Sequence, residues 1–388
     1  RRPPGQGRPR TAGEVEVMKK IVSLKEVCAS DYGVTASATE QPTGTHFLRI
    51  TDIVNFTDYS GVPFVDIDDE DRRKKLLKQN DIVVARTGAT VGASHLFRGT
   101  EPTVFASYLV RFRPKTSDVD PVFVSYVLNS PAWKQFISAN AHSKSAQPNL
   151  SAAAMMDFQF SLPEISEQQK IASVLKALDD KLAANQRTIR DCESLSEALF
   201  RKTSATADTT TLGKELELHY GKALPKKSRI PGKVTVVGSG GISGFHNEIL
   251  LDGPSIIVGR KGTIGTVHWI SGPNYPIDTT FWVESKRLPL ELLYFLLKSC
   301  DFASMNTDSA VPGLNRKNAY QVAVPWISED SASEIGPLLK TLRARQEHAR
   351  KENQILARTR DELLPLLMSG RITVGEAEDA ADEAASES

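Results

Sequence analysis

Apolar residues recur seven positions apart in two long stretches of the chain, within residues 164–202 and 327–372. A seven-residue repeat predicts a long α-helix with one narrow apolar seam, as in a coiled coil. No glycine or proline interrupts the first stretch. The residues expected to pair are Ile171, Leu175, Leu178, Leu182, Ile189 and Leu199 in the first stretch, and Ile335, Leu339, Leu342, Leu356 and Leu363 in the second.

Each predicted helix needs a partner for its seam. A helix of about 36 residues is about 54 Å long, and a helix with a single apolar seam is marginal alone in water. The simplest arrangement pairs the two helices as an antiparallel coiled coil; the alternative is that each seam packs on its own globule. Asn185 and Asn353 lie within the seams, and such polar residues either specify the register of a pair or mark solvated stretches.

Ahead of each helical stretch, the same order of shorter segments occurs twice. Residues 81–88 (Asp-Ile-Val-Val-Ala-Arg-Thr-Gly) match residues 255–262 (Ser-Ile-Ile-Val-Gly-Arg-Lys-Gly), and each is an apolar strand that runs into Arg-x-Gly. Residues 145–150 match residues 309–314, and a strand of alternating apolar residues follows each of them. The duplication predicts a mixed α/β (α+β) fold with two similar globules, each followed by a long helix.

These patterns divide the chain into successive segments. Residues 375–388 hold six acidic and no basic residues, which predicts a disordered tail. The residues before Met18 lack an apolar core, and we interpret them as a disordered leader or an upstream extension. The expected segments are a leader (1–17), a globule (18–163), a helix (164–202), a polar linker (203–210), a second globule (211–326), a second helix (327–372) and an acidic tail (373–388).

Composition excludes several classes of protein. The 48 basic and 47 acidic residues give a net charge of +1, so any nucleic-acid footprint must be local. The three cysteines form no Cys-x-x-Cys pair, which argues against a zinc ribbon or a disulfide framework and predicts a cytoplasmic location. No apolar run approaches the roughly 20 residues that cross a bilayer.

The sequence offers no catalytic set. Residues 238–244 are rich in glycine and follow an apolar strand, but no amphipathic helix follows them, as a phosphate-binding loop would require. A methyltransferase that acts on adenine would need an Asn/Asp-Pro-Pro-aromatic loop, and the one Pro-Pro pair is Pro3-Pro4. There is no Gly-x-x-x-x-Gly-Lys-Ser/Thr motif, and the seven histidines show no metal-ligand spacing. We therefore expect neither catalytic residues nor a metal site.

The motifs resemble those of the specificity (S) subunit of type I restriction-modification systems. They include the strand with Arg-x-Gly in each copy and residues 162–171 (Leu-Pro-Glu-Ile-Ser-Glu-Gln-Gln-Lys-Ile), which open the first helix. They also include residues 363–372 (Leu-Leu-Pro-Leu-Leu-Met-Ser-Gly-Arg-Ile), which close the second helix, and the glycine-rich residues 238–244. The resemblance covers residues 18–373, and the duplicated order of globule and helix carries it.

This resemblance implies a non-catalytic DNA-binding subunit with two target-recognition domains, each of which reads one half of a bipartite, asymmetric DNA target. It implies that the paired helices bind two adenine-N6 methyltransferase (M) subunits, and that a translocase/nuclease (R) subunit joins the complex. S-adenosylmethionine, ATP and Mg would be bound by those partners, and no cofactor by this chain. The second copy has Ser331-Ala332 where the first has Glu167-Gln168, so the helices need not contact their partners identically.

Two other functions fit the duplicated architecture. One is the recognition subunit of another split-site restriction system, in which a fused nuclease-methylase replaces the separate subunits. The other is a coiled-coil scaffold with two protein-binding globules and no DNA role. Binding to DNA with a steep dependence on salt would favour the DNA-binding functions, and no binding at low salt would favour the scaffold.

Arg86 and Arg260 are the leading candidates for DNA contact, because each ends a strand beside glycines that allow a close approach. The alternative is a structural turn with a buried ion pair. Since both copies carry the same motif, contact with the DNA backbone is expected rather than base readout. The full set of candidates is Arg86, Lys144, Gln147, Asn149, Lys222, Lys226, Lys227, Arg229, Arg260, Lys261, Asn315, Arg316 and Lys317.

The two globules differ in charge. Residues 211–326 contain 13 basic and 9 acidic residues, a net charge of +4, whereas residues 21–162 contain 14 basic and 15 acidic residues, a net charge of −1. The first globule is therefore a poor DNA binder by charge alone. Either its basic residues gather on one face, or partner subunits supply the positive field.

Overall fold

The computed structural model describes residues 20–54, 59–141, 148–305 and 313–386, which form two compact units. Unit 1 comprises the chain up to Lys181 together with Ile355–Glu387, and unit 2 comprises Leu182–Gln354. We call residues 20–162, in unit 1, the first globule, and residues 209–326, in unit 2, the second globule. The expected leader, residues 1–17, lies outside the described residues.

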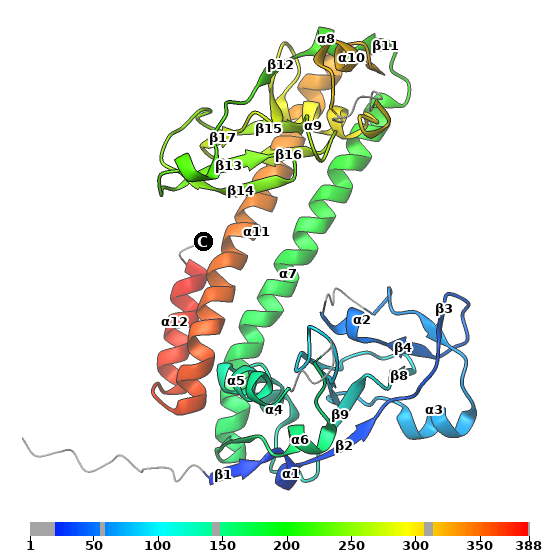
Figure 1. The fold of residues 1–388 in the computed structure, drawn as a ribbon, viewed down its shortest axis with the longest axis vertical. Helices are drawn as coiled ribbons and strands as arrows, with labels where there is room; N and C mark the ends of the chain where they lie inside the picture. The colour runs from blue at the N-terminus through cyan, green and yellow to red at the C-terminus, as the bar shows by residue number, and fades with distance from the viewer. Residues whose placement is uncertain (1–19, 55–58, 142–147, 306–312, 387–388) are drawn as a thin grey trace, which may run out of the picture. The chain divides into compact units, whose positions relative to one another are not determined.

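Two long helices, α7 (Ile165–Ser204) and α11 (Glu329–Ser369), each contribute to both units and pack against each other (Figure 1). In unit 2, Asn185 of α7 meets Asn353 of α11, whereas Glu193, further along α7, meets Gln346, which is earlier in α11. The two helices are therefore antiparallel. The prediction of a mixed α/β fold with two globules and two paired long helices is confirmed.

The first globule contains two four-stranded sheets, in the orders β2-β9-β6-β7 and β3-β5-β4-β8, and a β1-β10 pair. The first sheet is antiparallel, while β4 and β8 of the other are parallel. Val83 and Leu109 of the first sheet share a core with Phe105 of the other. The elements are β1 (Lys20–Ser23), α1 (Leu24–Val27), β2 (Cys28–Tyr32), β3 (Ala38–Thr39), β4 (His46–Leu48), α2 (Ile50–Val54), β5 (Phe64–Val65), α3 (Asp69–Lys75), β6 (Ile82–Ala85), β7 (Ser94–Leu96), β8 (Thr103–Phe105), β9 (Leu109–Pro114), α4 (Pro121–Val127), α5 (Pro131–Asn140), α6 (Ala152–Met156) and β10 (Gln159–Leu162).

The second globule contains a four-stranded antiparallel sheet in the order β12-β18-β15-β16, a three-stranded sheet in the order β14-β13-β17, and a β11-β19 pair. Its main core is formed by one face of the four-stranded sheet and α9. The elements are β11 (Thr209–Thr211), α8 (Leu212–Glu215), β12 (Leu216–Tyr220), η1 (Lys226–Ser228), β13 (Val234–Gly238), β14 (Gly241–His246), β15 (Ser255–Gly259), β16 (Val267–Ile270), β17 (Asn274–Pro276), β18 (Thr280–Ser285), α9 (Leu290–Lys298), η2 (Ala303–Met305), α10 (Arg316–Tyr320) and β19 (Ala323–Pro325).

The globules share one complete sheet, and their other sheets differ by one edge strand, β3. The antiparallel sheets β2-β9-β6-β7 and β12-β18-β15-β16 have the same order relative to the chain, and we call each of them the common sheet. In each globule a terminal two-stranded pair, β1-β10 or β11-β19, precedes the long helix. The remaining sheets differ in strand number, four against three. The glycine-rich residues 238–244 are part of the β13-β14 hairpin, so they form a strand connection rather than a phosphate-binding loop.

The seams bury residues both against the other helix and within a globule. Phe200 of α7 and Ile335 and Leu339 of α11 belong to the main core of the second globule. The two arrangements that the sequence left open are thus combined, because the ends of the seams complete a globule. Among the expected pairing residues, Ile171, Leu175, Leu178, Ile335, Leu339, Leu356 and Leu363 are buried, and Leu182, Ile189, Leu199 and Leu342 are partly buried.

The first turns of α7 and α11 are attached to their globules by different interactions. The fully buried side chain of Gln168 accepts a hydrogen bond from the Asp120 N–H at 2.9 Å and donates to the carbonyls of Asp118 and Pro163. At the matching position of α11, Ala332 is buried in the apolar core of the second globule. The departure noted in the sequence therefore replaces a hydrogen-bonded anchor with apolar packing.

Gln346 is the most buried polar residue where α7 and α11 pack in unit 2, with 1% of its surface exposed. Its amide nitrogen donates to the Ile189 carbonyl at 3.1 Å and to the Glu193 carboxylate at 3.0 Å, and its oxygen accepts from Arg343 at 3.1 Å. Burial acts to raise the pKa of Glu193, but hydrogen bonds from Gln346 and Lys298 outweigh it and hold the pKa below its ordinary value. The carboxylate therefore stays ionised.

Asn185 forms a second buried polar contact in unit 2. Its amide nitrogen donates to the Glu352 carboxylate at 2.6 Å and to the Asn353 side-chain oxygen at 3.0 Å. In unit 1, Arg360 of α11 pairs with Asp179 of α7 at 2.9 Å. The polar seam residues are hydrogen-bonded rather than solvated. They favour a single register, because a shifted pairing would leave buried polar groups unsatisfied.

The most apolar stretch of the chain forms α9, which is a core helix of the second globule. Leu292, Leu293, Leu296 and Leu297 of α9 are all fully buried. Among the helices of the described residues, none combines the length and the apolar character needed to cross a membrane.

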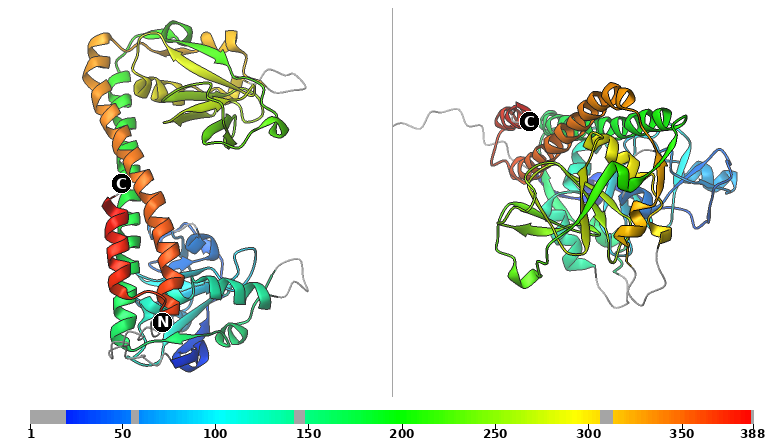
Figure 2. Two further views of the ribbon diagram at one scale, coloured as in Figure 1. Left: turned by 90° about the vertical axis from the view of Figure 1, so that its left-hand side faces the viewer. Right: turned by 90° about the horizontal axis from the view of Figure 1, so that it is seen from above.

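The acidic C-terminal segment is helical, so the prediction of a disordered tail was wrong over Val374–Ser386, which form α12. Thr373 and Glu376 cap the helix start through reciprocal hydrogen bonds. Ala377 and Ala384, seven residues apart, are buried, and α12 lies beside the last part of α11 (Figures 1 and 2). Net charge alone missed this small apolar stripe on an alanine-rich segment of high helix propensity.

Replacing Gln346 with alanine should lower the free energy of unfolding by about 1–3 kcal/mol, because Arg343 and the Ile189 carbonyl lose a buried partner. Urea denaturation followed by far-ultraviolet circular dichroism measures this loss. Gln354→Ala is the matched control, since Gln354 is exposed on the same helix. Equal losses in the two variants would contradict a stabilising role for the buried amide.

Candidate nucleic-acid interface

The two motifs that repeat in the sequence meet in the first globule. After β6, the Arg86 carbonyl accepts a hydrogen bond from the Leu150 N–H at 2.9 Å, and the Gly88 N–H donates to the Pro148 carbonyl at 3.0 Å. An isolated β-bridge joins Thr87 to Asn149. The Arg-x-Gly turn is thus joined to the residues that follow the polar segment 143–147. Lys144 and Gln147, two of the candidates, lie outside the described residues.

The same junction occurs in the second globule. The Arg260 carbonyl accepts from the Leu314 N–H at 2.9 Å, and a β-bridge joins Lys261 to Gly313. Gly88 and Gly262 both have positive φ angles, 82° and 80°, which explains the glycine in each Arg-x-Gly. The structure therefore brings together, in both globules, segments that the sequence only showed to be repeated.

A tyrosine stacks on each of the two arginines. The Arg86 guanidinium carbon lies 5.0 Å from the centre of the Tyr32 ring, and that of Arg260 lies 5.1 Å from the centre of the Tyr220 ring. Both tyrosines are partly open to solvent, with 39% and 51% of their surface exposed. Each pair consequently presents an aromatic face and a planar cation side by side, a combination suited to phosphates, sugars and bases.

A glycine after each tyrosine permits this arrangement. A Cβ atom on Gly33 would lie 2.1 Å from the Phe105 carbonyl oxygen, and one on Gly221 would lie 2.2 Å from the Ile277 carbonyl oxygen. Any other residue would therefore push the end of β2 or β12 away from the chain that follows β8 or β17. The Tyr-Gly pairs mark the repeat in the sequence, but nothing in the sequence linked them to Arg86 and Arg260.

Neither arginine is part of a buried ion pair, the alternative that the sequence left open. Within the described part of the chain, no carboxylate lies within ion-pair distance of Arg86 or Arg260, and the Nε atom of each is buried without a hydrogen-bond partner. Arg260 donates from Nη2 to the Asp278 carbonyl at 2.7 Å. The positive charge of both side chains thus remains uncompensated by the described residues, as a site for an anion requires.

The other candidates divide into free and occupied side chains. Asn315 caps α10 by accepting from the Lys317 N–H at 2.9 Å, and Arg229 donates to the Ser243 carbonyl at 2.7 Å. Arg316 stacks on Tyr220 at 5.1 Å. The side chains of Asn149, Lys222, Lys226, Lys227, Lys261 and Lys317 are exposed.

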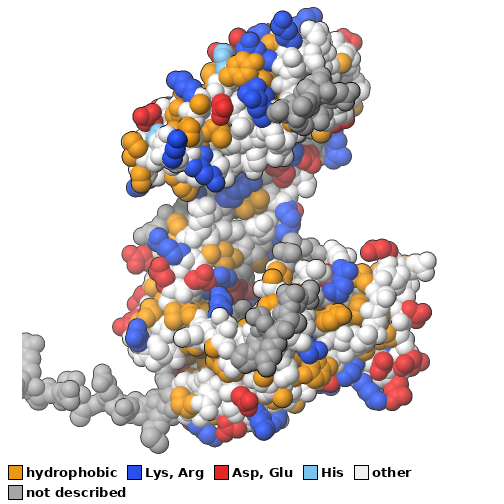
Figure 3. Space-filling model, viewed as in Figure 1, with side chains coloured by type: hydrophobic (Ala, Val, Ile, Leu, Met, Phe, Trp, Pro, Cys, Tyr) orange, Lys and Arg blue, Asp and Glu red, His pale blue; other side chains and the backbone are white. Residues whose placement is uncertain are grey.

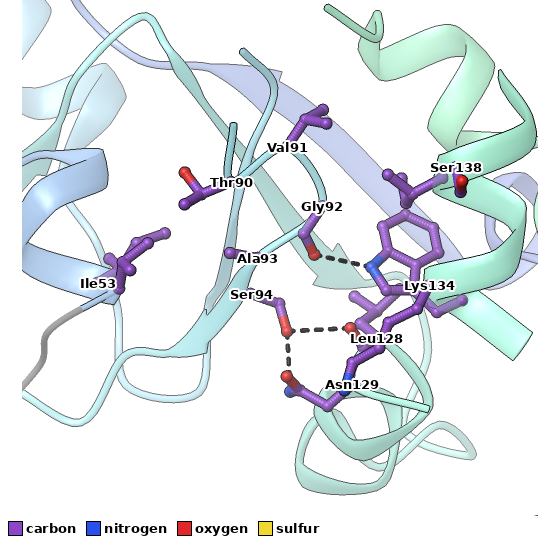
Figure 4. A pocket seen from close by; sticks show the side chains of 13 residues that line it. Ile53, Thr90, Val91, Gly92, Ala93, Ser94, Leu128, Asn129, Lys134 and Ser138 are labelled. Carbon is purple, nitrogen blue, oxygen red and sulfur yellow. Dashed lines mark hydrogen bonds between the residues drawn. The ribbon is translucent and has the colours of Figure 1, made fainter. Parts of the chain in front are cut away.

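A cavity of about 550 Å³ in the first globule has no catalytic set (Figure 4). The Trp133 indole donates to the Gly92 carbonyl at 2.8 Å, and Asn129 and Ser94 are hydrogen-bonded to each other at 2.9 Å. Among the described residues that line the cavity there is no carboxylate, histidine or cysteine, and Lys134 is the one charged side chain. These groups offer no acid-base pair and no activated nucleophile.

Among the described residues, strand pairing brings together three side chains of kinds that can bind a metal ion, which their spacing in the sequence did not indicate. Ligand atoms of Glu217, His219 and Glu284 lie within 4.8 Å of one another on the β12-β18 pair. His219 already pairs with Glu284 at 2.8 Å and stacks on Trp282 with ring centres 4.1 Å apart. The imidazole is thus engaged with both Glu284 and Trp282.

Comparison with known proteins identifies the N-terminal part of the chain. Residues 16–192 match the family described as "Type I restriction modification DNA specificity domain". The chain is also similar to the type I restriction enzyme HindI specificity subunit of Haemophilus influenzae, with 25% identity over 131 residues. That match covers 33% of this chain and spans 28% of the length of the relative.

The fold is similar to that of a solved specificity subunit. The crystal structure of the type I restriction-modification S subunit from M. genitalium superposes with a TM-score of 0.69 and 19% identity, over 92% of this chain and 97% of that one. Specificity subunits carry target-recognition domains and are not catalytic. Residues 16–192 of this chain thus carry the type I restriction modification DNA specificity domain, and the chain has the fold of a solved specificity subunit.

Proposed function

We propose that this chain is the DNA sequence-specificity subunit of a cytoplasmic type I restriction-modification complex. Each globule would read one half of a bipartite, asymmetric DNA target, and the chain would hold two adenine-N6 methyltransferase subunits on that target. The observation that carries this proposal is the junction that occurs in both globules, where an uncompensated arginine stacks on a partly exposed tyrosine. A scaffold that binds only proteins would not need the same cation-aromatic pair twice.

The asymmetry of the target follows from what the globules do not share. The common sheets place Arg86 and Arg260 in equivalent positions, so these residues suit contacts that do not depend on base sequence. The remaining sheets, β3-β5-β4-β8 and β14-β13-β17, share their central order, but the first has the additional edge strand β3 and the two differ in sequence. Different surfaces read different base edges, so the two half-sites should differ.

The methyltransferase subunits would dock on the long helices. In unit 2, Leu195 of α7 and Leu338 of α11 are each 51% exposed, although neighbouring seam residues are buried. A contiguous exposed apolar patch marks a protein contact, and we infer that these two leucines belong to such a patch. S-adenosylmethionine, ATP and Mg would be held by the methyltransferase and the translocase/nuclease subunits, and this chain would supply sequence specificity alone.

Expression of this chain with its methyltransferase partner, in a host free of DNA methylation, should produce a new pattern of methylated adenine. We expect a split motif of two unlike half-sites around a fixed gap, because two different readers are joined in one chain. Long-read sequencing detects the mark directly, and a host that expresses the methyltransferase alone is the control. A complex that assembles and binds S-adenosylmethionine but marks no motif would refute the proposal.

Exchange of residues 211–326 for the matching globule of another family member should change one half of that motif. The first half-site should stay as it is, since residues 20–162 and their contacts remain intact. The same sequencing experiment reports both halves at once. A change in both half-sites would show that the two globules are not independent readers.

Replacement of Leu195 and Leu338 with lysine should weaken binding of the methyltransferase subunit by at least about tenfold, because an apolar contact would lose two of its anchors. Titration calorimetry with the purified methyltransferase measures the affinity. Leu195→Met with Leu338→Met is the control that keeps both positions apolar, and it should bind as the wild type does. Unchanged binding by the lysine variant would place the docking surface elsewhere.

A further inference from the structure

We infer that the two globules hold DNA unequally, and that the second globule supplies a phosphate clamp formed by Lys222, Arg260, Lys261 and Arg316 around Tyr220. The first globule has a single arginine in the matching place. This inference rests on the proposed function and adds to it a division of labour. The second globule would provide most of the sequence-independent affinity, whereas the first would contribute readout with little charge.

The four clamp residues come from three segments of the second globule, after β12, after β15 and at the start of α10. Arg260 and Arg316 each place the guanidinium carbon 5.1 Å from the centre of the Tyr220 ring. Lys222 lies two residues after Tyr220 and forms a β-bridge with Ile277, while the Lys261 N–H donates to the Thr279 carbonyl at 3.0 Å. Residues 277–279 thus hold the backbone of both lysines, one on each side of the segment that follows β17.

Equivalent positions in the first globule can be assigned from the same backbone contacts. Val34 forms the bridge that corresponds to that of Lys222, and Thr87 forms the bridge that corresponds to that of Lys261. Ala152 begins α6 as Arg316 begins α10. Three of the four cations are therefore replaced by uncharged residues, and Val34 and Ala152 are buried. Where the second globule has Thr279, the first instead exposes 60% of Tyr108.

Ion pairs increase the difference between the globules. Among the described basic side chains of the first globule, seven are paired with carboxylates, namely Arg49, Arg72, Lys74, Lys75, Arg98, Arg111 and Arg113. Among the described basic side chains of the second globule, Arg287 and Lys298 are paired with carboxylates. One of the pairs in the first globule has a buried carboxylate, since Asp81, just before β6, is 1% exposed and accepts two hydrogen bonds from Arg113. The pairs within α3 are exposed.

The surface charge agrees with this count. Figure 3 shows basic side chains spread over the second globule, whereas in the first globule acidic and basic side chains lie together around α3. Asp278 is the acidic residue at the clamp, and its carbonyl rather than its carboxylate contacts Arg260. Unpaired cations release counterions from DNA when they bind phosphates, while cations already paired with carboxylates release few. The sequence-independent affinity should therefore come mainly from the second globule.

The test transplants the residues of the first globule into the clamp. The variant Lys222→Val, Lys261→Thr and Arg316→Ala, purified with the methyltransferase, should bind DNA at least about tenfold more weakly at about 0.1 M salt. The slope of log affinity against log salt should fall by about 2 to 3, since each lost phosphate contact removes about 0.9. The methylated motif should keep both halves, because base readout is not altered.

The matched control removes the same charge from the first globule. Lys25→Gln, Lys78→Gln and Lys134→Gln replace three exposed lysines that form no ion pair with the described residues, and the slope should change by less than about 0.5. If the clamp variant unfolds, which a thermal melt reveals, Lys222→Gln with Lys261→Gln replaces it, because both side chains are exposed.

The outcomes separate this inference from the proposed function. Equal loss of affinity in the clamp variant and the control would overturn the unequal division, while the wild-type complex still wrote its motif. A clamp variant with an altered half-site would show that these residues read bases, which also overturns the inference. A wild-type complex that binds no DNA at low salt would instead remove the proposed function itself.

Discussion

The two apolar seams are the constraint on which the rest of this structure depends. Helices α7 and α11 contain 40 and 41 residues, and neither could keep a single apolar face exposed to water. Each seam is covered partly by the other helix and partly by a globule, since Phe200, Ile335 and Leu339 complete the core of the second globule. Formation of that core and pairing of the helices are consequently coupled, so a substitution that destabilises one also destabilises the other.

Apolar seams alone would tolerate a shift of one helix along the other by a heptad. The buried amides of Gln346 and Asn185 remove that freedom, because their hydrogen bonds to the other helix exist in one register only. Gln168 has a similar effect where α7 leaves the first globule, since its three hydrogen bonds set how the helix starts. Burial of apolar surface thus stabilises the helix pair, whereas the buried polar groups select its register.

The two globules share a backbone architecture but differ in charge at matching positions. The common sheet repeats the Tyr-Gly and Arg-x-Gly turns, and with them a cation-aromatic pair suited to any nucleic-acid backbone. Substitutions at the matching positions Val34 and Lys222, or Ala152 and Arg316, change the charge without changing the frame. The second sheets keep the same central order, β5-β4-β8 and β14-β13-β17, but the first globule adds the edge strand β3. In such a pattern the shared residues bind the ligand, and the residues that differ between the globules distinguish one ligand from another.

The sequence by itself determined the two long helices, the duplication and the two matched arginines, because periodicity and repetition are properties of residue order alone. The prediction of a disordered tail was wrong, because it considered the charge of the segment and not the seven-residue spacing of Ala377 and Ala384. Only the tertiary structure decided which cations are neutralised, as Arg113 is by Asp81, and which stay free. It also decided that Tyr220 meets Arg260 and Arg316. These contacts join residues far apart in the chain, and strand register, which no local pattern encodes, brings them together.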